Sequence, residues 1–103
     1  MTNTRVKGRR LEHRAKALLT AQGFDCELSR PSSRFQTQND LWGLYDVVGI
    51  SATEIICVQV KANRWPRSHE MQAMTDWPCP PGVRREAWRF DDRTAEPRIR
   101  IIS

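Results

Sequence analysis

The alternation of apolar and polar residues along the chain predicts seven elements of secondary structure. Over residues 6–22, apolar side chains such as Leu11 and Ala15 recur at helical spacing, and Gly23 follows as a helix C-cap. Ser68 is placed to cap a second, shorter helix. The expected order is a helix over 6–22, strands over 24–28, 46–50 and 55–61, a helix over 69–76, and strands over 83–90 and 98–102.

The two central strands are expected to form a hairpin that is apolar on both faces. If Ile50 pairs with Ile55 across the connection 51–54, the residue numbers of every paired couple sum to 105. In this register one face includes Val48, and the other includes Val47. Because strands that are apolar on both faces are buried on both, we expect the hairpin at the centre of a sheet.

Polar side chains interrupt this hairpin at its open end. In the expected register Asp46 stands opposite Gln59, and Lys61 shares a face with Gln59 because side chains alternate with period two. An acid and an amine at the border of a buried sheet cost desolvation energy unless they find partners or serve a function. The convergence of Asp46, Gln59 and Lys61 therefore indicates a functional site.

A divalent cation would suit this group of side chains. Mg²⁺ prefers oxygen ligands in octahedral geometry. Asp46 offers a carboxylate, Gln59 an amide oxygen and Val60 a backbone carbonyl. Lys61 is then placed to orient a water molecule at the metal or to stabilise charge that builds on a phosphate. The alternative is that Asp46 is a turn acid before a strand and that Lys61 extends to solvent from the sheet border.

The spacing of these residues resembles the motif of the PD-(D/E)XK, or restriction-endonuclease-like, nuclease superfamily. In that motif an acid at the start of one strand precedes a (D/E/Q)xK triplet at the end of the next, and here 12 residues separate Asp46 from Gln59. The resemblance covers residues 8–62 and matches Lys61 to the motif lysine. Gln59 stands where glutamate is commoner, so the site would carry one negative charge fewer.

The first helix extends the resemblance. The segment GRRLEHRAKALLTAQGF, residues 8–24, is similar to the opening helix of archaeal Holliday-junction resolvase-like members. The segments DLWGLYDVVGI and VQVKAN look like those of small phage and bacterial relatives. Many members add a glutamate from this helix, which makes Glu12 a further catalytic and metal-binding residue. Its alternative role is an ion pair with Lys16, one helical turn away.

The resemblance implies a single restriction-endonuclease-like α/β domain over residues 1–103, with a mixed β-sheet flanked by helices. It implies a metal-dependent endodeoxyribonuclease that uses Mg²⁺ or Mn²⁺ and acts on branched, Holliday-junction-like DNA, and a homodimer is expected. The expected catalytic residues are Glu12, Asp46, Gln59 and Lys61. The expected metal ligands are Glu12, Asp46, Gln59 and Val60. The alternative is a DNA-binding or assembly module of the same fold with weak or lost catalysis.

Positive charge is concentrated in the first third of the chain. The net charge is +5, and residues 39–103 carry equal numbers of acidic and basic side chains, so the excess lies in residues 1–38. Arginine predominates, and its planar guanidinium suits phosphate. This predicts DNA as partner, and the alternative is a solvated basic face. Trp65 either stacks on DNA bases or packs against other side chains of the protein. The expected DNA contacts are Arg9, Arg10, Arg14, Arg30, Arg34 and Arg64.

Composition narrows the class of protein further. The chain has 103 residues, of which 39% are hydrophobic and 28% charged, which suits one folded domain. Three widely separated cysteines without metal-ligand spacing predict reduced thiols and a cytoplasmic location. No apolar run approaches the ~20 residues of a membrane span, and the N-terminal segment has no secretory pattern.

Overall fold

The computed structural model describes residues 4–29 and 44–102 of the chain. Of the expected DNA contacts, Arg30 and Arg34 lie outside the described residues. The elements follow the predicted order and differ from the predicted bounds by at most two residues. They are α1 (Thr4–Ala21), β1 (Asp25–Leu28), β2 (Val47–Ile50), β3 (Ile55–Ala62), α2 (Ser68–Asp76), β4 (Val83–Phe90) and β5 (Arg98–Ile101).

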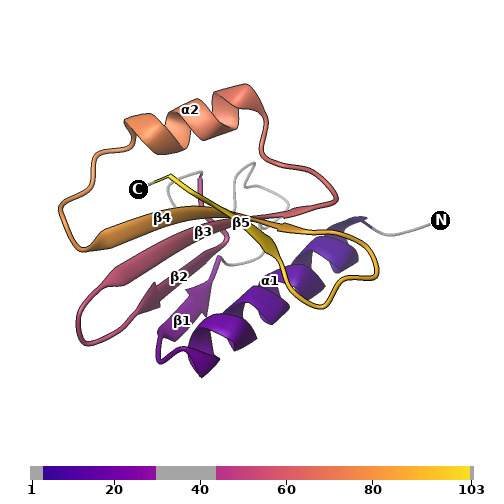
Figure 1. Cartoon of the computed structure of the whole chain (residues 1–103), viewed down its shortest axis with the longest axis horizontal. Coiled ribbons are helices and arrows are strands. Elements are labelled where there is room, and N and C mark those ends of the chain that lie inside the picture. Colours follow the sequence, from indigo (N-terminus) through magenta and orange to yellow (C-terminus); the bar gives the residue numbers. More distant parts are fainter. Residues whose placement is uncertain (1–3, 30–43, 103) are drawn as a thin grey trace, which may run out of the picture.

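The strands form one mixed sheet in the order β1-β2-β3-β4-β5 (Figure 1). Neighbouring strands are antiparallel except β3 and β4, which are parallel. A parallel pair cannot be joined by a tight turn, so the chain crosses from β3 to β4 through α2. The prediction of an α/β domain with a mixed sheet is confirmed.

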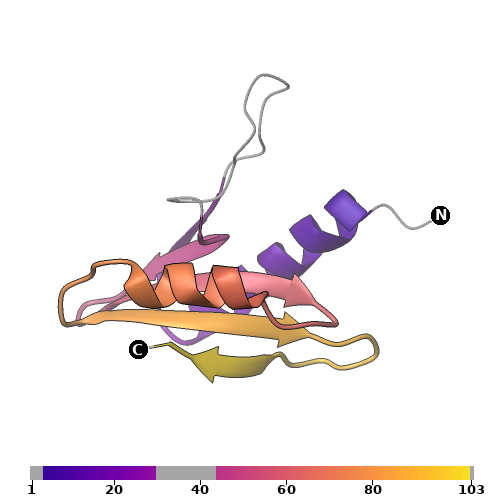
Figure 2. The ribbon, with the colours of Figure 1, turned by 90° about the horizontal axis from the view of Figure 1, so that it is seen from above.

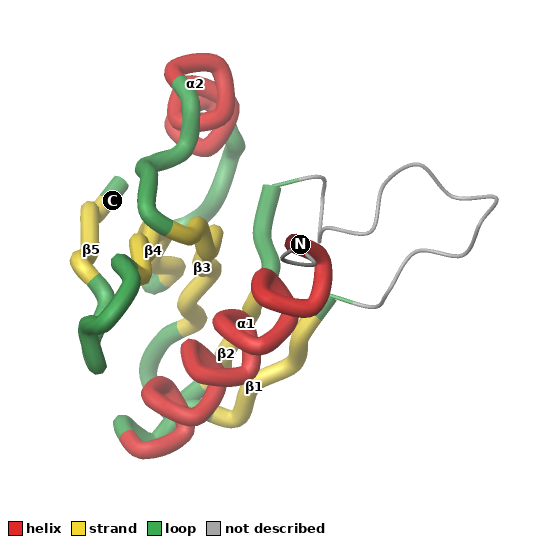
Figure 3. Tube along the Cα trace, turned by 90° about the vertical axis from the view of Figure 1, so that its right-hand side faces the viewer, coloured by secondary structure: helices red, strands yellow, loops and turns green. Residues whose placement is uncertain are grey.

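The two helices cover opposite faces of the sheet (Figures 2 and 3). On one face Leu11 and Leu19 of α1 pack with Ile56 of β3. On the other face Met74 of α2 packs with Cys57 of β3. Consecutive residues of β3 thus enter different cores, which is the two-sided burial that the apolar hairpin predicts. Among the described elements no helix is long and apolar enough to cross a membrane.

The hairpin register is confirmed, but it ends in a β-bulge. Residues 47–50 pair with residues 55–58, and the paired numbers sum to 105. The backbone N–H of Asp46 then donates to the carbonyl oxygen of Val58 at 2.9 Å, although Val58 already pairs with Val47. Tyr45 accordingly belongs to the core under α2 and Val47 to the core under α1, whereas residues two apart in a regular strand share a face. The regular register therefore does not continue to an Asp46–Gln59 pair.

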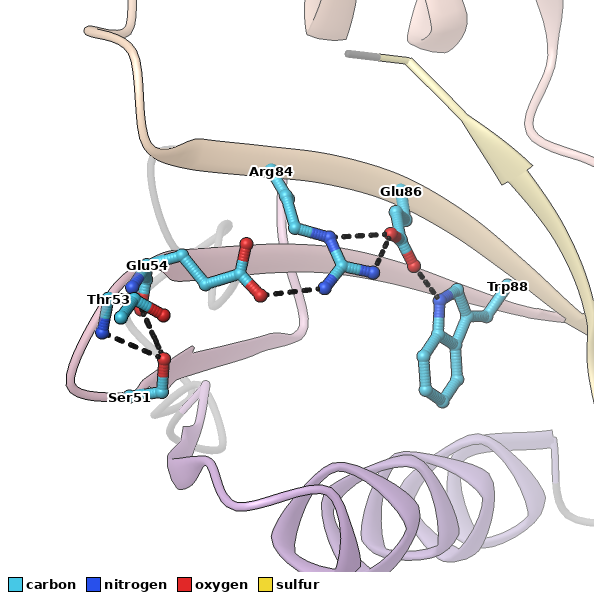
Figure 4. A network of polar contacts seen from close by, with 6 residues as sticks. All are labelled: Ser51, Thr53, Glu54, Arg84, Glu86 and Trp88. Carbon is cyan, nitrogen blue, oxygen red and sulfur yellow. Dashed lines mark hydrogen bonds and ion pairs between the residues drawn. The ribbon is translucent and has the colours of Figure 1, made fainter.

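A buried carboxylate in the middle of β4, that of Glu86, takes part in a polar network that reaches the hairpin turn (Figure 4). Oε2 of Glu86 accepts hydrogen bonds from Nε and Nη2 of Arg84 at 3.2 and 2.7 Å, and Oε1 accepts one from Nε1 of Trp88 at 2.9 Å. Nη1 of Arg84 also donates to Glu54, beside the β2–β3 turn, at 2.9 Å. The network therefore ties the hairpin turn to β4 and stabilises the parallel pairing of β3 with β4.

Candidate active site

The candidate site lies where the bulge at Asp46 meets the C-terminal half of β3. The Asp46 side chain is buried, and its Oδ2 accepts the backbone N–H of Val60 at 2.7 Å. This charge-assisted hydrogen bond fixes the orientation of the carboxylate. A carboxylate has about four acceptor sites, which is more than the bond to Val60 uses. The Asp46 carboxylate is therefore held against the backbone of β3 at Val60.

The Gln59 side chain supplies a buried amide oxygen. Gln59 is 5% exposed, and its Nε2 donates to Oε2 of Glu70 at 3.2 Å. Its Oε1 is buried and has no hydrogen-bond partner among the described residues. Leaving a buried acceptor unsatisfied costs about 1–3 kcal/mol, so such an atom points to a water or an ion as its partner. An oxygen ligand of this kind fits the coordination preference of Mg²⁺.

Glu70 is a residue of this site that the sequence did not single out. It lies in the first turn of α2, and its Oε2 is 2.9 Å from Nζ of Lys61. Its Oε1 accepts the backbone N–H of Arg67 at 3.1 Å. Arg67, and not Ser68, is the N-cap of the helix, so the predicted cap was wrong by one residue. From the sequence alone, Glu70 is an acid in the first turn of the expected helix over 69–76, a position that acids commonly occupy.

The ionisation of Glu70 is set by these neighbours. Burial raises the pKa of the Glu70 carboxyl, but hydrogen bonds from Lys61 and from the backbone of Arg67 oppose burial. The positive charges of Lys61 and Arg64 act in the same direction, and the resulting pKa lies below its usual value. Glu70 is therefore an anion at neutral pH and balances the charge of Lys61.

Lys61 borders an open cavity. The cavity of about 520 Å³ is lined by Lys7 and Gly8 of α1 and by residues 60–64 at the end of β3. The side chain of Arg64 is 48% exposed and lies 3.8 Å from Glu70. The cavity is thus bordered by three basic side chains, which suits a phosphate-bearing ligand.

Glu12 reaches the site region through a chain of contacts. Its Oε1 accepts a hydrogen bond from Nη1 of Arg9 at 3.0 Å. Arg9 also donates to the carbonyl oxygen of Ser29, and the N–H of Ser29 donates to the carbonyl oxygen of Asp46 at 2.8 Å. In the described ranges no three Asp, Glu, His or Cys side chains gather as metal ligands. The predicted ligand set therefore depends on the Gln59 amide and the Val60 carbonyl as well as on carboxylates, and it stays a prediction.

The basic residues of α1 differ in their surroundings. Arg9 holds Glu12 and Ser29, while Arg14 donates to the carbonyl oxygen of Ala95 and lies 4.9 Å above the ring of Phe90. These two guanidinium groups therefore fasten α1 to other parts of the fold. Arg10 is exposed. The expected DNA contacts at Arg9, Arg10, Arg14 and Arg64 stay predictions.

A second basic surface was hidden by the even charge balance of residues 39–103. The ring of Trp65, in the connection between β3 and α2, has the guanidinium of Arg100 at 4.4 Å and that of Arg89 at 6.0 Å. Arg89 is the Cα partner of Lys61 in the parallel pair of strands. The cations of β4 and β5 therefore adjoin the candidate site, which net charge alone does not reveal.

Comparison with known proteins gives a structural likeness. No protein-family model and no curated protein matches the chain. The solved structure of Hjc, a Holliday junction resolvase from the archaeal hyperthermophile Archaeoglobus fulgidus, is similar with a TM-score of 0.68 and 14% sequence identity. The likeness covers 92% of this chain and 77% of the resolvase. The chain thus has the fold of this resolvase, which confirms the predicted restriction-endonuclease-like α/β fold.

Proposed function

We propose that the protein is a metal-dependent endonuclease that cleaves phosphodiester bonds of branched DNA. The observation that carries the proposal is the group of side chains at the bulge and the end of β3: a buried carboxylate, an amide whose oxygen has no partner in the described part of the chain, and a lysine beside an open cavity. The fold of a Holliday junction resolvase supports it. Because one fold can host many functions, the proposal depends on the site more than on the fold.

Each residue has a role in the proposed reaction. Asp46, Gln59 and the carbonyl of Val60 would hold Mg²⁺ or Mn²⁺, with Glu12 contributing from α1. The ion supplies Lewis-acid stabilisation of the phosphate when bound. The Lys61 ammonium donates hydrogen bonds to the phosphate or to the attacking water. Exposed arginines such as Arg64 bind the DNA backbone, which positions the strand without reading its sequence.

The proposal is tested with Asp46→Asn. Asparagine keeps an oxygen that can accept the N–H of Val60, so the variant removes the negative charge and retains the hydrogen bond. Wild-type protein should cleave a four-way junction in the presence of Mg²⁺ or Mn²⁺ and not with EDTA. The variant should be slower by about 100-fold or more and should bind the junction as well as wild type does. Equal cleavage by both proteins, or no cleavage of any branched or linear DNA by wild type, would refute the proposal.

A second candidate function is a DNA-binding or assembly module with weak catalysis. It is favoured by the neutral Gln59 in place of an acid and by the ion pair that holds Lys61 against Glu70. This function predicts salt-dependent junction binding without cleavage. A homodimer would match a two-fold symmetric junction. Sedimentation of the protein alone and with the junction measures this association.

A further inference from the structure

The charge balance at the end of β3 points to a residue outside the predicted motif. The motif positions of the hairpin offer one carboxylate, Asp46, and the neutral amide of Gln59. Glu70 enters from α2, and its Oε2 contacts both Gln59, at 3.2 Å, and Lys61, at 2.9 Å. We infer that Glu70 is the second anionic ligand of the cation site and fills the role that an acid at position 59 would have.

This inference rests on the proposed metal-dependent function and concerns the same site. Asp46 and Glu70 contact consecutive residues of β3, because Asp46 accepts the N–H of Val60 and Glu70 accepts the side-chain N–H of Gln59. The side-chain amide of Gln59 has its Nε2 directed to Glu70. Its other end, Oε1, is left buried and without a partner among the described residues. Two carboxylates and a neutral oxygen are a ligand set that Mg²⁺ and Mn²⁺ accept.

The two carboxylate oxygens of Glu70 have different partners, and only one of them faces the inferred cation site. Oε1 accepts the N–H of Arg67 at 3.1 Å, which satisfies a backbone donor at the start of α2. Oε2 faces the motif residues Gln59 and Lys61. If Glu70 only held α2, Gln59 and Lys61 in place, its replacement by glutamine would lower stability and leave the metal affinity of the folded protein nearly unchanged. A ligand would affect metal affinity in variants that remain folded.

The test removes the acid at position 70 of α2 and then introduces one at position 59 of β3. Glu70→Gln removes the charge and keeps an oxygen for the N–H of Arg67. The double variant Gln59→Glu/Glu70→Gln restores an acid at the commoner motif position. Binding of Mn²⁺ to each protein is measured by isothermal titration calorimetry without DNA, and circular dichroism with EDTA shows that each is folded. Glu54→Gln is the control, because Glu54 also pairs with an arginine but lies beside the hairpin turn.

Glu70→Gln should weaken Mn²⁺ binding by tenfold or more, and the double variant should return to within about threefold of wild type, while the control is unchanged. If Glu70→Gln binds Mn²⁺ as wild type does, or if the double variant is as weak as the single one, the inference is wrong. Asp46→Asn separates the existence of the metal site from the role of Glu70. If that variant loses Mn²⁺ binding and Glu70→Gln does not, only the role of Glu70 is overturned. If wild type binds no Mn²⁺ and cleaves nothing, the metal site and the role of Glu70 both fail.

Discussion

Replacing Arg84 with methionine should reveal how much the buried carboxylate of Glu86 depends on its partner. Glu86 is 1% exposed, and of the three hydrogen bonds that its carboxylate accepts from described residues, two come from the guanidinium of Arg84. Arg84→Met leaves the hydrogen bond from Trp88 and removes the compensating charge. Removing one member of a buried ion pair costs about 3–5 kcal/mol, because the remaining charge is left uncompensated.

The lower end of that range applies here. The Arg84 side chain is 39% exposed, so solvent screens part of its attraction to the carboxylate. We therefore expect a loss of about 3 kcal/mol in the free energy of unfolding. A domain has about 5–15 kcal/mol in total, so the variant should still fold at 25 °C. With a slope of about 1.5 kcal/mol per molar, the urea midpoint should fall by about 2 M.

The matched control is Arg84→Met/Glu86→Gln, which removes both charges and keeps an acceptor for the indole N–H of Trp88. Urea unfolding followed by circular dichroism should place this double variant within about 1.5 kcal/mol of wild type, since a buried pair replaced by neutral groups of similar volume is often nearly neutral. A loss under about 1 kcal/mol in Arg84→Met, or a double variant no more stable than the single one, would contradict the reasoning.

Two further predictions concern packing and pH. Gly49→Ala would place a Cβ 2.9 Å from Sγ of Cys26 and 3.1 Å from Cβ of Phe24. Urea unfolding should therefore show a loss of about 1–3 kcal/mol in the free energy of unfolding. Unchanged stability would mean that β1 is not packed against β2 as described. Because the pKa of Glu70 is lowered in the folded state, its contribution to stability is present above the unfolded pKa of about 4.3 and is lost as the pH falls through the folded pKa. Glu70→Gln should therefore flatten the decline of the unfolding free energy on the acid side of pH 5, and an equally steep decline would show that Glu70 is not responsible.

The fold was predictable where the sequence pattern leaves one solution. The strands around the 51–54 turn are apolar on both faces, so turn length and alternation together specify the register that the structure shows. The bulge was not predictable in this way. Tyr45 and Val47 are both apolar, and each can be buried whether or not an extra residue lies between them. When both faces of a sheet are buried, an extra residue leaves the pattern of apolar side chains unchanged. The sequence pattern therefore cannot reveal the bulge.

The site was predictable in part for a similar reason. Asp46 directly precedes β2 and Gln59 lies on β3, so the hairpin brings them to the same end. Glu70 reaches Gln59 only because the crossover places α2 over that end of β3, which is a tertiary relation. The engagement of Arg14 depends on the carbonyl of Ala95, 81 residues further along the chain. A count of charges gives the number of arginines and not the direction in which each one points.

The bulge at Asp46 also has a consequence for aligning this chain with others. Residues 47–50 keep their pairing with β3 whatever happens before them, because the extra residue is absorbed at position 46. A related chain that lacks the bulge would have one residue fewer at this point and the same strand after it. Aligned without a gap, its residue opposite Tyr45 would belong to the other face of the sheet, and the error would continue through every position upstream as far as the next compensating gap.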